Sequence, residues 1–175
     1  MSRVNRSGGK IVAAFVTLVR KEGYQGVSVA DIVREAGVSR ITFYRNFSSR
    51  EDVMAQFIEG VSGEAREAVR QKLQEHSLRS YVELIFASVL PYSDVIRELY
   101  AANVGELILN AFNRYFLETP MDWEGFRTGA YERSFLIGAI YNVMLEWIRG
   151  GGQETPAEMA VIFSHMINEK EIIYA

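Results

Sequence analysis

Apolar residues recur along this chain at intervals of three and four residues and almost never alternate one by one with polar residues. Such spacing places apolar side chains on one face of an α-helix, whereas alternation would indicate a β-strand. The pattern predicts an all-α protein, with two short helices between Ser28 and Phe47. The longer helices are expected at about residues 8–22, 49–74, 78–90, 93–102, 105–117, 123–149 and 155–172.

Residues with strong positional preferences mark several helix ends. Gly23 is expected to stop the first helix, and the glycines at 150–152 are expected to stop the helix before them. Thr155-Pro156-Ala157-Glu158 combines an N-cap, a proline at the first helical position and a capping-box glutamate. Ser49 and Asp52 form a variant of the same box at the start of the long fourth helix. The boundary at Thr155 is therefore the best defined in the sequence.

The stretch from Ser28 to Phe47 has the pattern of a helix-turn-helix. Ser28 and Asp31 can form a capping box, Gly37 can adopt the left-handed conformation of a tight turn, and Ser39 can cap the next helix. The apolar residues that would wedge the two helices apart at a steep angle are Ile32, Val33, Ala36, Val38, Phe43 and Phe47. The spacing alone also fits a purely structural corner.

The second helix of this pair has an outer face without acidic residues. Phe43 and Phe47 lie one turn apart and face the apolar contact between the two helices, so other side chains occupy the opposite face. These are Ile41, Thr42 and Arg45, flanked by Tyr44 and Asn46. Such groups read base edges or hold phosphates. Arg40 and Arg50 add positive charge beside helix N-termini, which themselves attract phosphate.

Charge is distributed unevenly along the chain. Residues 1–50 carry nine Lys/Arg against three Asp/Glu, and residues 51–175 carry ten against nineteen. A basic N-terminal part followed by an acidic C-terminal part is typical of a protein that binds a polyanion through one end. Cysteine is absent, which suits a reducing cytoplasm, and no apolar run is long enough for a transmembrane helix. We therefore expect a cytoplasmic protein with no membrane partner.

The stretch from Val38 to Asp52, with Gly23-Tyr24 and Ser28 to Ile32 before it, resembles the signature of the tetracycline-repressor (TetR/AcrR) family. The resemblance implies an all-helical homodimer with a three-helix DNA-binding head at residues 1–47 and a body at 48–175. The residues that match the family's DNA-contacting positions are Ser28, Arg40, Ile41, Thr42, Tyr44, Arg45, Asn46 and Arg50. By this resemblance Tyr44 and Arg50 would hold phosphates, while Arg40, Ile41 and Thr42 would face bases. Asn46 departs from the bulkier aromatic residue or histidine common at its position.

The C-terminal part is similar to a short subgroup of the same family. The matching stretch runs from Trp147 to Ala160, and the subgroup includes regulators of the dihydroxyacetone-kinase type. Aromatic residues before it could line an apolar pocket for a small effector, although for each one a place in the core is the simpler interpretation. The expected pocket residues are Tyr81, Phe86, Tyr100, Phe112 and Phe116.

The last two helices are expected to form the dimer. The penultimate helix is apolar on more than one face, which implies burial against its own chain and against another. The residues expected in this isologous four-helix interface are Gly138, Tyr141, Leu145, Phe163 and Ile167.

The expected function is sequence-specific regulation of transcription from a double-stranded, pseudo-palindromic operator. A repressor would occlude the operator until an apolar effector shifts the spacing of the two heads. Two alternatives stay open: a regulator or activator controlled by a partner protein with no small ligand, and a helical interaction protein that has lost DNA binding. We expect no enzyme and no cofactor, because no nucleophile-and-base arrangement is visible. No metal site is expected either, because His76 and His165 lack ligands at metal spacing.

Overall fold

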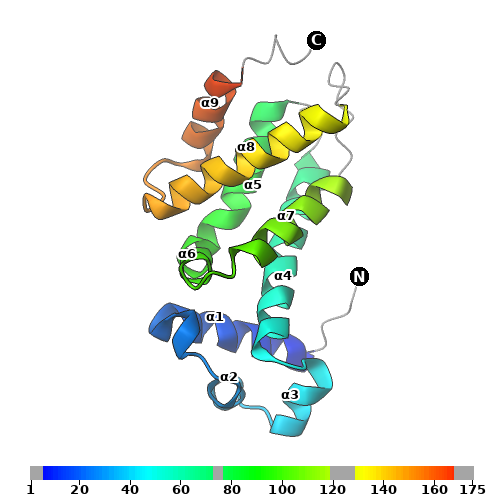
Figure 1. Cartoon of the computed structure of the whole chain (residues 1–175). Helices are drawn as coiled ribbons and strands as arrows, with labels where there is room; N and C mark the ends of the chain where they lie inside the picture. The colour runs from blue at the N-terminus through cyan, green and yellow to red at the C-terminus, as the bar shows by residue number, and fades with distance from the viewer. Residues whose placement is uncertain (1–5, 73–76, 119–128, 168–175) are drawn as a thin grey trace. The chain divides into compact units, whose positions relative to one another are not determined.

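The computed structural model describes residues 6–72, 77–118 and 129–167 (Figure 1). Every regular element in these ranges is helical, as the apolar spacing predicts. The helices are α1 (Arg6–Gly26), α2 (Val29–Ala36), α3 (Arg40–Asn46), α4 (Arg50–Lys72), α5 (Leu78–Val89), η1 (Leu90–Tyr92), α6 (Ser93–Ala101), α7 (Gly105–Glu118), α8 (Ala130–Arg149) and α9 (Pro156–Met166). No helix within the described ranges is long and apolar enough to cross a membrane.

Three helix ends differ from the sequence-based expectation. The first helix is broken at Gly23, which has φ 70° and ψ 159°, but one more turn follows it as far as Gly26. Helix α8 begins only after Gly129, whose extended backbone forms the N-cap. Helix α9 ends at Met166 because Ile167 has φ −106° and ψ 103°, which are not helical angles. The expected parts at residues 123–128 and 168–172 lie outside the described residues.

The described chain forms two compact units. The first contains residues 6–60 and 94–107 of the described chain, which include α1–α3, the beginning of α4, all of α6 except its first residue and the first turn of α7. Three aromatic rings meet in its core: the Phe15 ring lies 6.2 Å from Tyr24 and 6.4 Å from Phe57, between ring centroids. Because Phe57 packs on α1, the first turns of α4 belong to this unit.

The second unit contains residues 61–93 and 108–167 of the described chain. Helix α5 packs along α9. Helix α8 is held by two aromatic contacts, Phe86 with Trp147 at 5.1 Å and Phe112 with Tyr141 at 5.6 Å between ring centroids. The indole N–H of Trp147 donates to the Glu154 carbonyl at 3.1 Å, which fixes the turn before α9.

Candidate nucleic-acid interface

The turn between α2 and α3 is built by short-range hydrogen bonds. The Ser28 hydroxyl accepts from the Asp31 N–H while the Asp31 carboxylate accepts from the Ser28 N–H, both at 3.2 Å. Gly37 has φ 61°, and the N–H groups of Gly37 and Val38 donate to carbonyls in the last turn of α2. The Ser39 hydroxyl then accepts from the Thr42 N–H at 3.1 Å. The capping box, the glycine turn and the Ser39 cap are therefore confirmed.

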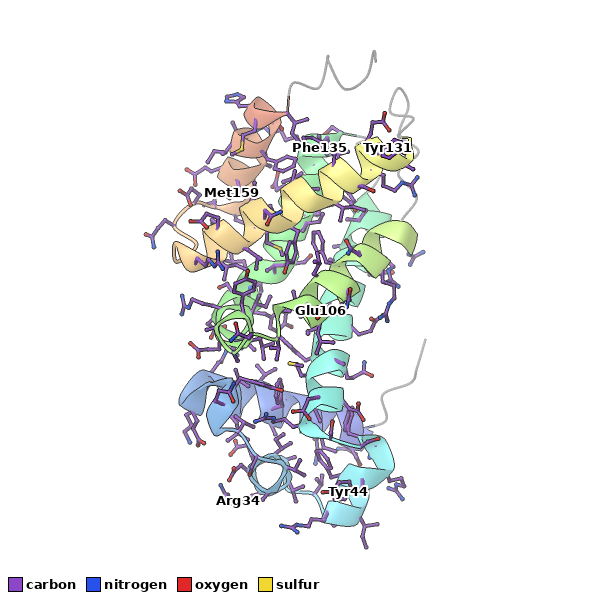
Figure 2. All side chains as sticks on the ribbon, viewed as in Figure 1. Arg34, Tyr44, Glu106, Tyr131, Phe135 and Met159 are labelled. Atoms are coloured by element: carbon purple, nitrogen blue, oxygen red, sulfur yellow. The ribbon has the colours of Figure 1, made fainter. Side chains whose placement is uncertain are left out.

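One face of α3 is buried and the other is open. The Phe43 side chain is 0% exposed and packs against Phe47, with 6.1 Å between ring centroids. On the opposite side Ile41 is 81% exposed. Tyr44, on the flank of the helix, is 60% exposed although its ring meets that of Phe43 edge-on at 5.3 Å between centroids (Figure 2). Arg40 and Arg45 are exposed as well, and the helix contains no acidic residue. A short helix with this polarity presents arginine, phenol and aliphatic groups outward, a set suited to base edges and phosphates.

Four of the residues matched to DNA-contacting positions, Ser28, Thr42, Asn46 and Arg50, have side chains that bond to their own chain, the first three of them over short distances in sequence. The Ser28 hydroxyl donates to the Asp31 carboxylate, and its hydrogen bonds lower the pKa of Asp31. The Asn46 amide turns back along α3 and donates to the Thr42 carbonyl at 2.6 Å. The Thr42 hydroxyl itself lies 2.9 Å from the Ser39 hydroxyl. The Asn46 amide is thus turned toward the backbone of α3, whereas Ser28 stays exposed while it bonds to Asp31.

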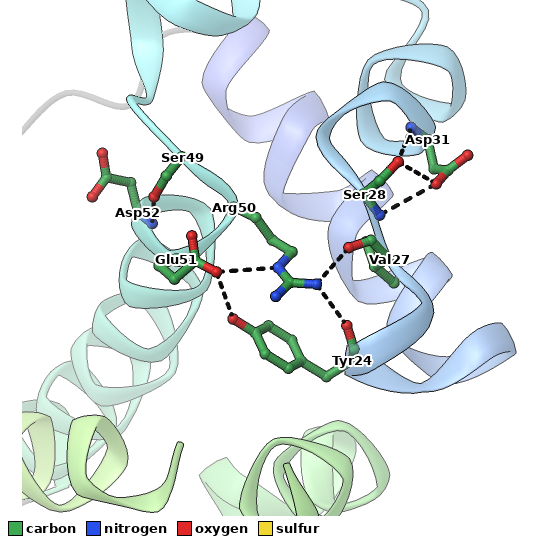
Figure 3. Close-up of polar contacts among 8 residues, drawn as sticks. All are labelled: Tyr24, Val27, Ser28, Asp31, Ser49, Arg50, Glu51 and Asp52. Carbon is green, nitrogen blue, oxygen red and sulfur yellow. Dashed lines mark hydrogen bonds and ion pairs between the residues drawn. The ribbon is translucent and has the colours of Figure 1, made fainter. Parts of the chain in front are cut away.

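Arg50 is held by the chain at several points (Figure 3). Its Nη1 donates to the carbonyls of Val27 at 2.7 Å and Tyr24 at 3.2 Å, and its Nε donates to Glu51 Oε1 at 3.2 Å. The guanidinium carbon lies 4.3 Å from the centroid of the Tyr24 ring. The sequence singled out Arg50 for its charge but gave no reason to pair it with Tyr24, since the two are 26 residues apart.

The expected pocket residues lie in different parts of the structure. Tyr81, Phe86 and Phe112 are buried in the second unit, and the latter two pack on aromatic rings of α8. Tyr100 belongs to the first unit, where its ring lies against the backbone of Gly105. The Phe116 side chain lies outside the described part of the chain. Within the described part of the second unit, Phe86 and Phe112 thus contribute to the core.

The residues expected at a dimer interface are mostly interior. Tyr141, Leu145, Phe163 and Ile167 are buried within their own chain, and only Gly138 of the expected set is partly exposed, with open space where a Cβ would stand. These four side chains are therefore covered mainly by their own chain, and their place in a dimer interface stays a prediction. The large apolar side chains that α8 and α9 expose are Tyr131, Phe135, Ile162 and Met166. Figure 2 shows Tyr131 and Phe135 on the same helix, one turn apart.

Two family models match the sequence. One, described as bacterial regulatory proteins of the tetR family, matches residues 11–57, which span α1 to the start of α4. The other, described as the C-terminal region of transcriptional regulators, matches residues 78–169, more than half of the chain. The chain belongs to the TetR family. This TetR-family protein is accordingly a sequence-specific DNA-binding regulator of transcription. A search of curated proteins gave no match.

Solved structures share the fold of this TetR-family chain at low sequence identity. The dihydroxyacetone kinase operon activator DhaS is 18% identical with a TM-score of 0.70, covering 94% of this chain and 96% of its own. A putative TetR-family regulator from Syntrophomonas wolfei is 16% identical with a TM-score of 0.70, covering 97% and 95%. FadR from Bacillus subtilis, solved with stearoyl-CoA, is 17% identical with a TM-score of 0.61, covering 90% and 96%. The likeness to DhaS agrees with the expected similarity to the dihydroxyacetone-kinase type.

Proposed function

We propose that α3 is the recognition helix and that it enters the major groove of an operator half-site. The main support for this proposal is the contrast between the two sides of α3: Phe43 is fully buried, whereas Ile41 is 81% exposed. Arg40, Ile41 and Thr42 face base edges, and Tyr44 and Arg45 hold the phosphates beside them. An exposed isoleucine on a short helix without acids is well suited to contact thymine methyl groups.

The chain acts as a homodimer on a pseudo-palindrome. A twofold dimer places two recognition helices about 34–36 Å apart, one turn of the duplex, or further if the half-sites are more widely spaced. The support is the exposed apolar residues of α8 and α9, among them Tyr131 and Phe135. An apolar surface of this kind is better covered than left in water.

We propose repression released by an apolar small molecule as the mode of regulation. FadR of Bacillus subtilis was solved with stearoyl-CoA, so this fold accommodates an acyl ligand in that protein. The second candidate is activation without a small ligand, which is favoured by the name of DhaS, an operon activator. A reporter gene placed behind the operator sequence that the protein selects distinguishes repression from activation. Deletion of a repressor raises reporter expression, and deletion of an activator lowers it.

Selection from a pool of random duplexes tests DNA recognition directly. The wild type is expected to enrich a pseudo-palindrome, and Arg40→Ala is expected to relax the preference at one symmetric pair of positions by about 1–3 kcal/mol. Tyr44→Phe removes only the hydroxyl and should lower affinity for all duplexes alike. Arg79→Ala is the matched control, because Arg79 is also an exposed arginine in the first turn of a helix, α5. Enrichment of no sequence by the folded wild type would contradict the proposal.

A further inference from the structure

We propose that Arg50 is a positioning residue that locks the first turn of α4 to the end of α1, in place of the phosphate contact that its sequence position suggests. The inference deepens the proposed DNA-binding function and rests on it. It concerns only the first unit, where all the atoms involved lie. The residues of this lock are Tyr24, Val27, Arg50 and Glu51.

The two carbonyls that Arg50 binds lie at the end of α1, Tyr24 in its last turn and Val27 just after it, where carbonyls need donors. Gly23 interrupts α1, and the carbonyls in the last turn of a helix lack intrahelical partners. The Tyr24 carbonyl receives the Val27 N–H at 3.3 Å, and Nη1 of Arg50 supplies a second donor there and one to Val27. A cation near the C-terminal end of a helix is also favoured by the helix dipole. The guanidinium therefore completes the hydrogen bonding of this turn.

Tyr24 and Glu51 hold the same guanidinium from its other sides. The Tyr24 ring is buried and lies against the guanidinium plane, and its hydroxyl donates to Glu51 Oε1 at 3.2 Å. Burial raises the pKa of Tyr24, so the phenol keeps the proton that it donates. Backbone hydrogen bonding is the main cause that lowers the pKa of Glu51, so its carboxylate is charged and accepts from both Tyr24 and Arg50. The three side chains form a closed cycle.

This geometry limits the contacts that Arg50 can make with DNA. Three of its five N–H groups, the two of Nη1 and the one of Nε, already donate within the chain, which leaves those of Nη2, and the side chain is only 23% exposed. The position is nevertheless sensitive, because Val27 immediately precedes Ser28, the N-cap of α2. The lock thus sets where the helix-turn-helix starts relative to α4, the helix that continues from the first unit into the second.

Arg50→Lys distinguishes a lock from a phosphate contact. A lysine keeps the positive charge that a phosphate needs but has no planar fork for two carbonyls and no face to stack on Tyr24. If Arg50 is part of a lock, Arg50→Lys should bind the selected operator about tenfold more weakly than the wild type. Its affinity for random duplex, and the slope of log affinity against log salt concentration, should stay at the wild-type values. Arg70→Lys is the control on the same helix, because Arg70 is exposed and pairs with Glu67 within α4.

The dependence of operator affinity on half-site spacing separates a loss of orientation from a simple loss of protein stability. Operators with one base pair added or removed between the half-sites should be rejected less sharply by Arg50→Lys than by the wild type, because the helix-turn-helix is less firmly oriented on α4. A folding defect would lower affinity for all spacings in the same ratio. Circular dichroism at the binding temperature establishes that the variant is folded.

Two results would overturn the lock. The first is the behaviour of a phosphate contact. Arg50→Lys would then keep the operator affinity and the spacing preference of the wild type, and Arg50→Ala would flatten the dependence of log affinity on log salt concentration by about one unit. The other is independent of DNA: thermal unfolding in which Arg50→Lys and Tyr24→Leu have additive effects, whereas residues in one network are expected to couple. If the wild type selects no duplex, the proposed function itself is overturned. The double-mutant cycle of thermal unfolding would then still show whether the lock exists without a role in DNA binding.

Discussion

The Nε of Arg20 in α1 donates to Oδ2 of Asp94 in α6 at 2.8 Å, and Nη2 of the same guanidinium lies 3.4 Å from Oδ1. This two-point contact joins residues 74 positions apart within the first unit. Partial burial opposes ionisation of Asp94, but the hydrogen bonds from Arg20 and from the Val95 N–H outweigh it and lower the pKa of the carboxyl below 3.8. The pair is therefore charged at neutral pH and ties α6 to α1.

Acid should weaken this tie. A carboxyl whose pKa is lower in the folded protein stabilises the fold above its unfolded pKa, and this contribution is lost as the pH falls from about 3.8 through the folded pKa. Both side chains are nearly half exposed, so we expect a coupling of only about 0.5 kcal/mol. A double-mutant cycle with Arg20→Met and Asp94→Asn measures it by denaturant unfolding. Coupling that persists well below the folded pKa would contradict the assignment.

Ser39 offers a way to separate helix capping from DNA contact. Ser39→Ala removes the acceptor for the Thr42 N–H and should lower the free energy of unfolding by about 1 kcal/mol. Ser39→Asp keeps a capping acceptor, so its stability should stay close to that of the wild type. Its carboxylate would stand at the exposed start of α3 and should repel the operator. Thermal unfolding and operator titration of the two variants should therefore rank them in opposite orders.

Two glycines with equal space around them should respond in opposite directions to alanine. At both Gly37 and Gly60 the position that an alanine methyl group would take has no heavy atom within 4 Å, so steric clash contributes at neither site. Gly37 has φ 61°, where an L side chain costs about 1 kcal/mol, whereas Gly60 lies within α4, where alanine gains about 0.5–1 kcal/mol in helix propensity. Unfolding should show Gly37→Ala destabilised and Gly60→Ala stabilised. A destabilised Gly60→Ala would contradict the open space described around this position.

The dimer proposal is tested by two substitutions on α8. Phe135 is 59% exposed, so Phe135→Glu should leave the fold intact but yield a monomer with weakened operator binding. Leu145 is buried in its own chain, so Leu145→Glu places an unpaired carboxylate in the core and should prevent folding, at a cost of several kcal/mol. Sedimentation gives the mass and circular dichroism gives the fold. A Phe135→Glu protein that remains a dimer would place the interface elsewhere.

Features that depend on a few neighbouring residues could be predicted from the sequence. Ser28 with Asp31, Gly37, Ser39, and Thr155 with Glu158 all cap or end the helices as their spacing indicates. These interactions span three or four residues, so a local sequence pattern contains both partners. The burial of Phe43 and the exposure of Ile41 follow in the same way from the helical repeat.

Tertiary structure decided the rest, because the partners lie far apart in the chain. The sequence showed α8 to be apolar on more than one face, but it could not say which face its own chain covers: the face with Tyr141 and Leu145 is buried, and the face with Tyr131 and Phe135 is exposed. In the same way, the sequence showed the charge of Arg50 but not the carbonyls of Tyr24 and Val27 that accept its hydrogen bonds. Helical periodicity defines the faces of a helix, and only packing against distant residues determines what each face meets.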